Sequence, residues 1–172
     1  MKLFRSAYFL PKDIPLLFNR RTREVTFSQI RLHTFWKFWI MPGFDAPITV
    51  PWNSIHARSY KFTQYMHSIL RESYRLALWA VSPENPKKLL VKEAIGYLGC
   101  YEDEMLWLVY EHIRRYMEEG GPPIQHGEKP RKPRRGRDLP PFPAPVLATL
   151  GGPALTDEEV LQFAEKVPSQ PA

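Results

Sequence analysis

The chain has 172 residues, which suits one domain of ordinary size with an extension and is short for two. Apolar residues make up 44% of it, and five of them are tryptophans, so a hydrophobic core can form. The single cysteine, Cys100, excludes an internal disulfide and is typical of a reducing compartment, so we expect a cytoplasmic location. The sequence contains no run of 18 apolar residues, so it predicts no transmembrane helix.

The formal net charge of +6 comes from one short segment, and the rest of the chain carries no net charge. The segment holds six basic residues and no acid: Lys129, Arg131, Lys132, Arg134, Arg135 and Arg137. A fold that holds nucleic acid normally carries positive charge on its folded surface, so we do not expect nucleic acid as the main ligand. Arg131, Arg134 and Arg135 are candidates for contact with an acidic partner or anionic lipid; the alternative is a solvated linker.

Strand patterns occupy the first third of the chain. Residues Ile14–Ile30 predict a strand, a polar turn at Asn19–Thr22 and a second strand. The aromatic segment Leu32–Ile40 follows, and it favours a strand packed on both faces over a short buried helix. Within it, Trp36 and Trp39 are candidates for an exposed partner contact, although core packing is the more common role of a tryptophan in a small domain.

The middle of the chain alternates loops and strands. Residues Pro42–Pro47 predict a loop, and Ile48–Trp52 predicts an edge strand, because Pro51 cannot donate a backbone hydrogen bond. Ser54–Leu70 is ambiguous. Beyond it, the pattern predicts a strand over Tyr74–Val81 and a turn over Ser82–Pro86. A further strand or a helix is predicted from Leu89 onward.

An amphipathic helix is predicted from about Glu102 to Glu119. Its apolar residues recur at helical spacing: Leu106, Val109, Tyr110, Ile113 and Met117. Acids fill the first turn, where the helix dipole favours them, and Gly120 followed by prolines ends the helix. The acids Glu102, Asp103, Glu104 and Glu111 could contact a partner, but those of the first turn already have this electrostatic explanation.

The last third predicts a tail. Half of the eighteen prolines lie between Gly120 and Pro153, so we expect an extended or mobile segment there. Thr156 is a predicted N-cap of a short helix ending near Lys166. The predicted organisation is a binding domain over residues 1–121, a basic proline-rich linker over residues 122–153, and a short helix and tail over residues 154–172.

No catalytic, metal-binding or cofactor-binding pattern is recognisable. The five histidines do not form an HExxH motif, and one cysteine cannot form a cysteine cluster. Cys100 and His112 could be imagined as nucleophile and base, but three acids follow Cys100 directly and would raise its pKa, so a packing role is favoured. We therefore expect a protein that binds and does not catalyse.

Three segments, LLFNRRTREVTF, VPWNSIHA and RLALWAV, resemble an uncharacterised bacterial family with a phenylalanine-asparagine-arginine signature and a later Pro-Trp step. The likeness covers roughly Asp13 to Glu119. The matching positions are Phe18, Asn19, Arg20, Arg23, Val25, Pro51, Trp52 and Ile55.

Members of that family are often encoded beside toxins of type VI secretion systems. The resemblance implies an α+β fold, with a bent antiparallel sheet or partial β-barrel of the pleckstrin-homology type closed by the C-terminal amphipathic helix. It also implies an immunity protein whose partner is a cognate protein toxin, possibly a nuclease. Because this chain is not acidic, we expect it to bind such a toxin outside its nucleic-acid groove, or to prevent toxin assembly. Otherwise, we expect the helix acids to make the contact. The alternative is a membrane-peripheral or scaffolding module with its basic segment on anionic lipid.

Overall fold

The computed structural model describes residues 14–31, 43–66, 69–100, 102–129, 142–152 and 155–168. Several residues singled out from the sequence lie outside these ranges, together with the predicted strand over Leu32–Ile40: Trp36, Trp39, Arg131, Arg134 and Arg135. The side chain of Cys100 is also outside the description. The predictions for these residues therefore stay predictions.

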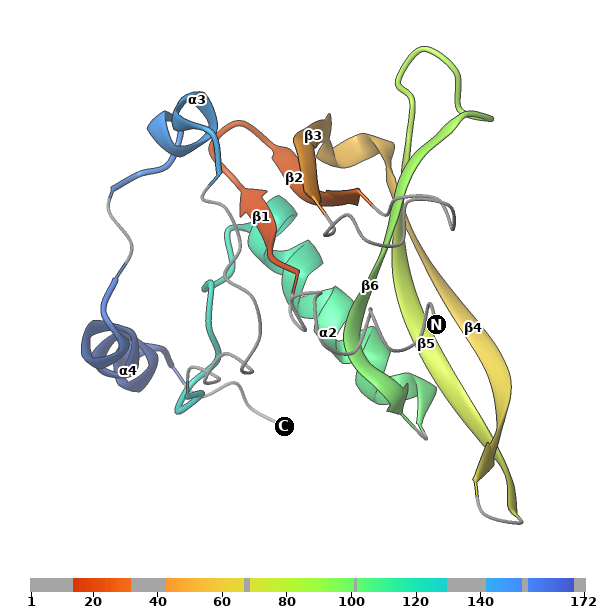
Figure 1. Ribbon diagram of the computed structural model, residues 1–172. Helices are drawn as coiled ribbons and strands as arrows, with labels where there is room; N and C mark the ends of the chain where they lie inside the picture. The colour runs from red at the N-terminus through yellow and green to blue at the C-terminus, as the bar shows by residue number, and fades with distance from the viewer. Residues whose placement is uncertain are drawn as a thin grey trace. The chain divides into compact units, whose positions relative to one another are not determined.

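The fold is α+β, as expected, with two open antiparallel sheets of three strands each (Figure 1). The first sheet has the order β1-β2-β3, and its strands are Leu16–Asn19, Glu24–Arg31 and Gly43–Pro51. The second has the order β4-β5-β6, and its strands are Ile55–Met66, Ile69–Val81 and Leu89–Cys100. Both are meanders, in which each strand pairs with the next along the chain.

The chain divides into two compact units. The first comprises Met1–Leu17, Thr26–Thr49 and Ile124–Ala172. The second comprises Phe18–Val25 and Val50–Pro123, and it contains the β4-β5-β6 sheet and the main helix.

The predicted strands at the start of the chain are confirmed as β1 and β2. Asn19 stabilises the turn between them, because its side-chain oxygen accepts from the backbone N–H of Arg21 at 3.0 Å.

The loop predicted over Pro42–Pro47 is wrong, because β3 runs through Pro47. An edge strand tolerates proline, since one side of its backbone needs no ladder hydrogen bond. The edge position predicted from Pro51 is confirmed.

In the first unit, polar contacts reinforce the pairing of β2 with β3. The hydroxyls of Thr26 and Thr49 lie 2.9 Å apart, and the exposed Arg31 forms an ion pair with Asp45. A 3₁₀ turn at Trp52–Ser54 then separates β3 from β4. This break explains why the strands form two sheets and not the single bent sheet expected.

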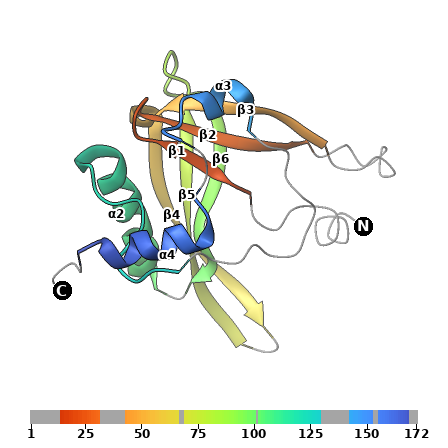
Figure 2. The same cartoon turned by 90° about the vertical axis from the view of Figure 1, so that its left-hand side faces the viewer.

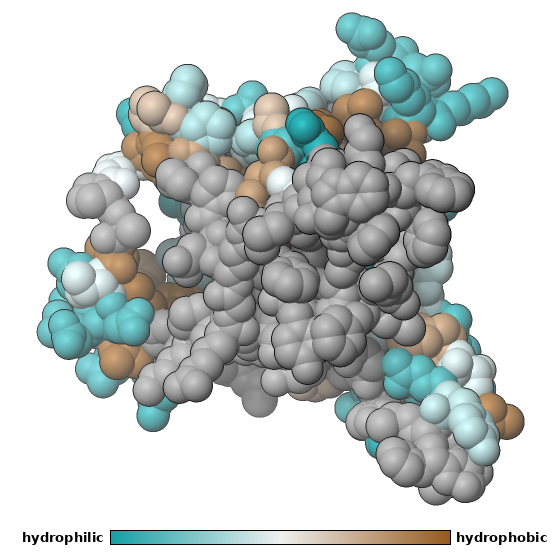
Figure 3. All heavy atoms as spheres, in the orientation of Figure 1, coloured by the Kyte–Doolittle hydropathy of each residue, from teal (hydrophilic) through white to brown (hydrophobic). Residues whose placement is uncertain are grey.

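The strand predicted at Tyr74–Val81 is confirmed as the centre of β5, and the ambiguous Ser54–Leu70 proves to be mostly β4. The turn at Ser82–Pro86 is also confirmed. It lies in a loop closed by hydrogen bonds between the backbones of Ser82 and Lys88 (2.9 Å) and of Lys88 and Asn85 (2.9 Å). This loop is hydrophilic (Figure 3, upper right).

Helix α2 spans Asp103–Arg114 and continues as a five-residue π-helix, Arg115–Glu119, which confirms the predicted amphipathic helix. It packs on β5 and β6 of the second unit (Figures 1 and 2). Its close approach depends on Gly96 of β6, which has φ +76° and at which a Cβ would lie 2.9 Å from the Leu106 side chain. As predicted, Gly120 ends the helix, in the left-handed conformation with φ +76°.

The tail differs in part from its prediction. Within the proline-rich segment, residues Ala144–Ala148 form a short helix, α3. Pro143 is its N-cap and Pro145 is its second residue, which is possible because proline is tolerated in the first turn. Helix α4, Asp157–Lys166, has the predicted N-cap at Thr156, which forms a reciprocal capping box with Glu159. In the first unit, the Val167 carbonyl at its C-terminal end lies 2.6 Å from Nδ1 of His126.

Candidate functional site

Helix α2 presents three distinct faces. The first is buried against the sheet of the second unit and contains Leu106 and Met117, each 2% exposed, with Tyr110 and Ile113 partly covered between them. Four of the five residues in the predicted apolar stripe therefore face inward. Val109 does not: it is 40% exposed, because it lies at the margin of the buried face.

The second face is apolar and exposed to solvent. Met105, Leu108 and Val109, spaced three and four residues apart, are 53%, 61% and 40% exposed, and we call them the outer apolar face. A surface helix usually carries apolar residues only on the side that it buries. Helix α2 carries them on a second side, so this side chain cluster is available for contact with another molecule.

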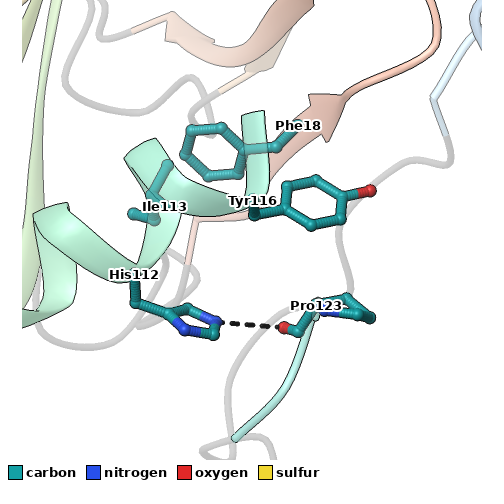
Figure 4. A pocket seen from close by; sticks show the side chains of 5 residues that line it. All are labelled: Phe18, His112, Ile113, Tyr116 and Pro123. Atoms are coloured by element: carbon teal, nitrogen blue, oxygen red, sulfur yellow. Dashed lines mark hydrogen bonds between the residues drawn. The ribbon is translucent and has the colours of Figure 1, made fainter. Parts of the chain in front are cut away.

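An open pocket of about 230 Å³ continues this face toward the end of the helix (Figure 4). His112 and Tyr116 follow Val109 at helical spacing and line the pocket together with Phe18, Ile113 and Pro123. Nε2 of His112 lies 3.3 Å from the Pro123 carbonyl oxygen, which joins the helix to the returning chain. The pocket is smaller than the sites that hold drug-sized ligands, so it suits a single side chain.

The chain reversal after the helix builds one wall of the pocket. Gly120 allows the turn, and the Gly121 N–H donates to the Arg115 carbonyl at 3.0 Å. Arg20 then fixes this arrangement from the β1–β2 turn: it donates to the Gly121 carbonyl at 3.2 Å, and its guanidinium lies 5.1 Å from the centre of the Tyr116 ring. The pocket is therefore assembled from segments a hundred residues apart.

Residues that carried the family resemblance gather at this end of α2. The Trp52 indole N–H donates to Oε1 of Glu118 at 2.8 Å, and its ring stacks on Tyr110 with centroids 6.3 Å apart. The Trp52 backbone N–H donates to the carbonyl of Arg23 at 2.8 Å, and Arg23 has a positive φ of 56°. The two short motifs thus hold the helix end and the β1–β2 turn together, and this is a structural role.

The third face of α2 is charged and largely self-neutralised. Arg114 donates to both carboxylate oxygens of Glu111, at 2.7 and 2.8 Å, and also to Glu118 (3.0 Å) and Glu119 (2.7 Å). The bonds from Arg114, and then those from Arg115, lower the pKa of Glu111 from its ordinary 4.5 to about 2. The pKa of Glu118 is also lowered, first by Trp52 and then by Arg114.

The acids predicted as a partner contact therefore differ from one another. Glu111 is engaged within the helix, and Asp103 accepts from the Ser59 hydroxyl and, at 3.2 Å, from the Trp107 indole. Glu102 and Glu104 are exposed, and no ion pair of the described residues involves them. Of the predicted acids on α2, these two remain the best placed for an external contact.

Among the described residues, no group of three or more His, Cys, Asp or Glu side chains could hold a metal ion. Burial raises the pKa of Glu93 on β6, and nearby Arg75 opposes this shift. Glu93 does not line the pocket.

Sequence reasoning missed the outer apolar face, although a signal was present. Met105, Leu108 and Val109 are apolar at helical spacing, but the predicted buried stripe includes only Val109. In a helical projection, the apolar residues of α2 span an arc that is too wide for one buried side. The packed structure is needed to show which part of this arc is buried. The pocket had no local signal, because Phe18 and Pro123 are far apart in sequence.

Comparison with protein-family models, with curated proteins and with solved structures finds no match to this chain. In the described part of the chain, each helix is too short or too polar to cross a bilayer. Function must therefore be inferred from the residues themselves.

Proposed function

We propose that this chain is an immunity protein that binds and neutralises a cognate protein toxin, with the outer apolar face of α2 as its contact surface. The observation that carries the contact surface is the exposure of Met105, Leu108 and Val109 beside an open pocket. The resemblance of the Phe-Asn-Arg and Pro-Trp segments supports the identity of the partner. Both motifs fall in the same unit as the outer apolar face.

The chemistry of the surface defines the partner's side of the contact. Stable protein interfaces have an apolar centre in which one or two large side chains fill pockets. The outer apolar face supplies the apolar centre, and the pocket beside His112 and Tyr116 accepts one side chain. We therefore expect the toxin to present an apolar patch with one protruding aliphatic or aromatic residue.

The electrostatics favour steric blockade over substrate mimicry. An inhibitor that imitates nucleic acid needs a surface of uncompensated acids, which would meet the basic groove of a nuclease. The carboxylates of Glu111 and Glu118 are already paired with Arg114. Contact through the outer apolar face would instead cover a part of the toxin outside such a groove, or would prevent the toxin from assembling.

We also propose that the second unit is part of a pleckstrin-homology-like arrangement. What supports this is a meander of antiparallel strands followed directly by an amphipathic helix that packs on β5 and β6. In a partial barrel, such a helix would cover the open side of the bent sheet.

The test is rescue of cells that express the product of the neighbouring gene, with binding measured on the purified pair. Leu108→Asp with Val109→Asp should abolish rescue and weaken binding at least a hundred-fold, because two charges would be buried at the centre of the contact. Glu102→Gln with Glu104→Gln is the matched control, since it changes two exposed residues at the start of the same helix without breaking a described ion pair.

Loss of rescue in the glutamine variant, with full rescue by the aspartate variant, would move the contact to the acids. Failure of the wild-type chain to bind or rescue would reject the immunity proposal. Thermal unfolding of each variant shows whether the fold is preserved, and both should unfold close to the wild-type temperature because all four positions are exposed.

A further inference from the structure

Three of the four edge strands of the two sheets carry features that hinder pairing with another chain. β1 has only four residues, and β3 contains Pro47 and Pro51, which lack a backbone N–H. The pairing of β6 with β5 shifts register, and Gly96 of β6 has φ +76°. Short strands, prolines and bulges are the usual means by which proteins protect sheet edges.

β4 is the edge strand that has none of these features. It runs for twelve residues without proline or glycine, and it pairs with β5 along its whole length without a register shift. Figure 1 shows it as the outermost strand of its sheet. Among the described residues, no strand pairs with its outer side, and no backbone hydrogen bond outside the sheets involves residues 56–66. Alternate residues of an edge strand direct their N–H and C=O groups outward, so β4 is a template for a further strand.

The outer apolar face of α2 is too small to hold a toxin by itself. A specific protein interface covers roughly 800 Å² on each partner and involves about 20 residues a side. The outer apolar face has three residues, and five more line the pocket beside it. The toxin contact therefore needs a second surface within reach of α2.

β4 lies next to the start of α2 and can supply that second surface. The Ser59 hydroxyl, near the middle of β4, donates to Asp103, the first residue of the helix. Met105 of the outer apolar face follows two residues later and is 53% exposed. A partner bound to this face can therefore continue along the edge of β4. Together with the twelve residues of β4, the contact then reaches the size of a specific interface.

The charge of β4 indicates which kind of strand can pair with it. β4 contains two basic residues and no acid, and one of them, Lys61, is already matched by Glu72 of β5 at 2.8 Å. The other, Arg58, is exposed, and its guanidinium lies 4.3 Å from the centre of the Trp79 ring. The ring orients Arg58 without neutralising it, and no ion pair of the described residues involves Arg58. An acid on the added strand would compensate this charge, whereas a second copy of β4 would bring only basic residues.

We propose that the toxin adds an extended strand to the open edge of β4, with an acidic residue opposite Arg58. This inference rests on the proposed function and deepens it: the outer apolar face binds a protruding side chain of the toxin, and β4 binds a stretch of its backbone. In strand addition, backbone hydrogen bonds provide the affinity, and side chains at alternate positions provide the specificity.

The experiment follows amide hydrogen exchange of the full chain by NMR, with and without the product of the neighbouring gene. In the complex, the amides of alternate residues along β4 should exchange about ten-fold more slowly or less, because the added strand bonds those that point outward. The amides of β6, the opposite edge of the same sheet, should keep their exchange rates.

Two matched variants test the acid opposite Arg58. Arg58→Gln should weaken toxin binding about two- to five-fold, the range for a cross-strand pair of opposite charges. Lys92→Gln is the control, because Lys92 is also exposed and lies 5.1 Å from the centre of the Trp79 ring, but on β6. It should leave binding unchanged. Arg58→Glu should weaken binding further, since like charges would then face each other.

Toxin binding and rescue with unchanged exchange along β4 would overturn the strand addition and leave the immunity proposal in place. Equal losses of binding in Arg58→Gln and Lys92→Gln would overturn the acid opposite Arg58. Slower exchange along β4 when the chain alone is concentrated would assign the edge to a second copy and also overturn the proposal. A wild-type chain that neither binds nor rescues would reject the proposed function, and the strand addition with it.

Discussion

The two solvent-facing sides of helix α2 differ in whether their side chains bond to one another. On the charged side, Arg114 bonds to three carboxylates, so little charge is left for a partner. On the outer apolar face, Met105 and Leu108 are more than half exposed. Charged residues, which are conspicuous in a sequence, can therefore be paired within the helix, whereas aliphatic residues form the surface available to a partner.

The two ends of the β4-β5-β6 sheet repeat this contrast. The loop from Ser82 to Lys88 is polar and closes on itself through backbone hydrogen bonds. At the other end, β4 and β5 carry Tyr65 and Leu70, which are 74% and 72% exposed. Within one sheet, therefore, the polar groups of one exposed end bond to one another, and the other end is suited to an apolar contact.

The largest effect is expected from the buried side of α2, set against its exposed side. Leu106→Ala should lower the free energy of unfolding by about 2–5 kcal/mol, because it leaves a cavity in the core. Leu108→Ala, two residues away and 61% exposed, should change it by no more than about 0.5 kcal/mol. Urea unfolding checks both; similar losses in the two variants would contradict the assignment of faces.

The close approach of α2 to β6 gives the next largest effect. Gly96→Ala should cost about 1–3 kcal/mol, because an alanine is strained at φ +76° and its Cβ would clash with Leu106. Gly43→Ala is the control, since nothing lies within 4 Å of the added Cβ there. Thermal unfolding of the two variants should separate them clearly, and a Gly96→Ala protein as stable as the wild type would disprove the close contact.

A smaller effect on stability is expected where the charged side of α2 contacts Trp52 in the second unit. Trp52→Phe should lower the free energy of unfolding by about 1–2 kcal/mol, because the indole bond to Glu118 is lost while stacking on Tyr110 is kept. A double-mutant cycle with Glu118→Ala, which removes the acceptor oxygen, isolates the pair. Strictly additive losses would show that the bond contributes nothing.

The smallest effect should come from the charged side itself. Glu111→Gln should cost less than about 1 kcal/mol at neutral pH, because exposed ion pairs are screened by solvent. The folded-state pKa of Glu111, about 2, lies below its ordinary 4.5, so its contribution is present above pH 4.5 and is lost as the pH falls toward 2. The stability difference between wild type and variant, measured by urea unfolding across this range, should therefore shrink as the pH falls. A difference that stays constant between pH 4.5 and pH 2 would reject this ion-pair origin.

Local patterns in the sequence were sufficient to predict several elements. Apolar, β-branched and aromatic residues around a polar turn predict β1 and β2, and alternation predicts β5. The glycine after Glu119 predicts the end of α2. These predictions succeed because the preference of each segment is set by its own side chains. The capping box at Thr156 predicted α4 for the same reason. Where an element depended on its neighbours, as for Pro47 inside β3, the local pattern was misleading.

The α+β class, most of the strands and the amphipathic helix follow from local patterns of amino acids. Tertiary packing is needed to show which apolar side of α2 is covered, which acids are paired, and that Phe18, Tyr116 and Pro123 share a pocket. Secondary-structure preference acts over only a few residues. Burial and pairing depend on contacts between segments that the chain brings together only when it folds.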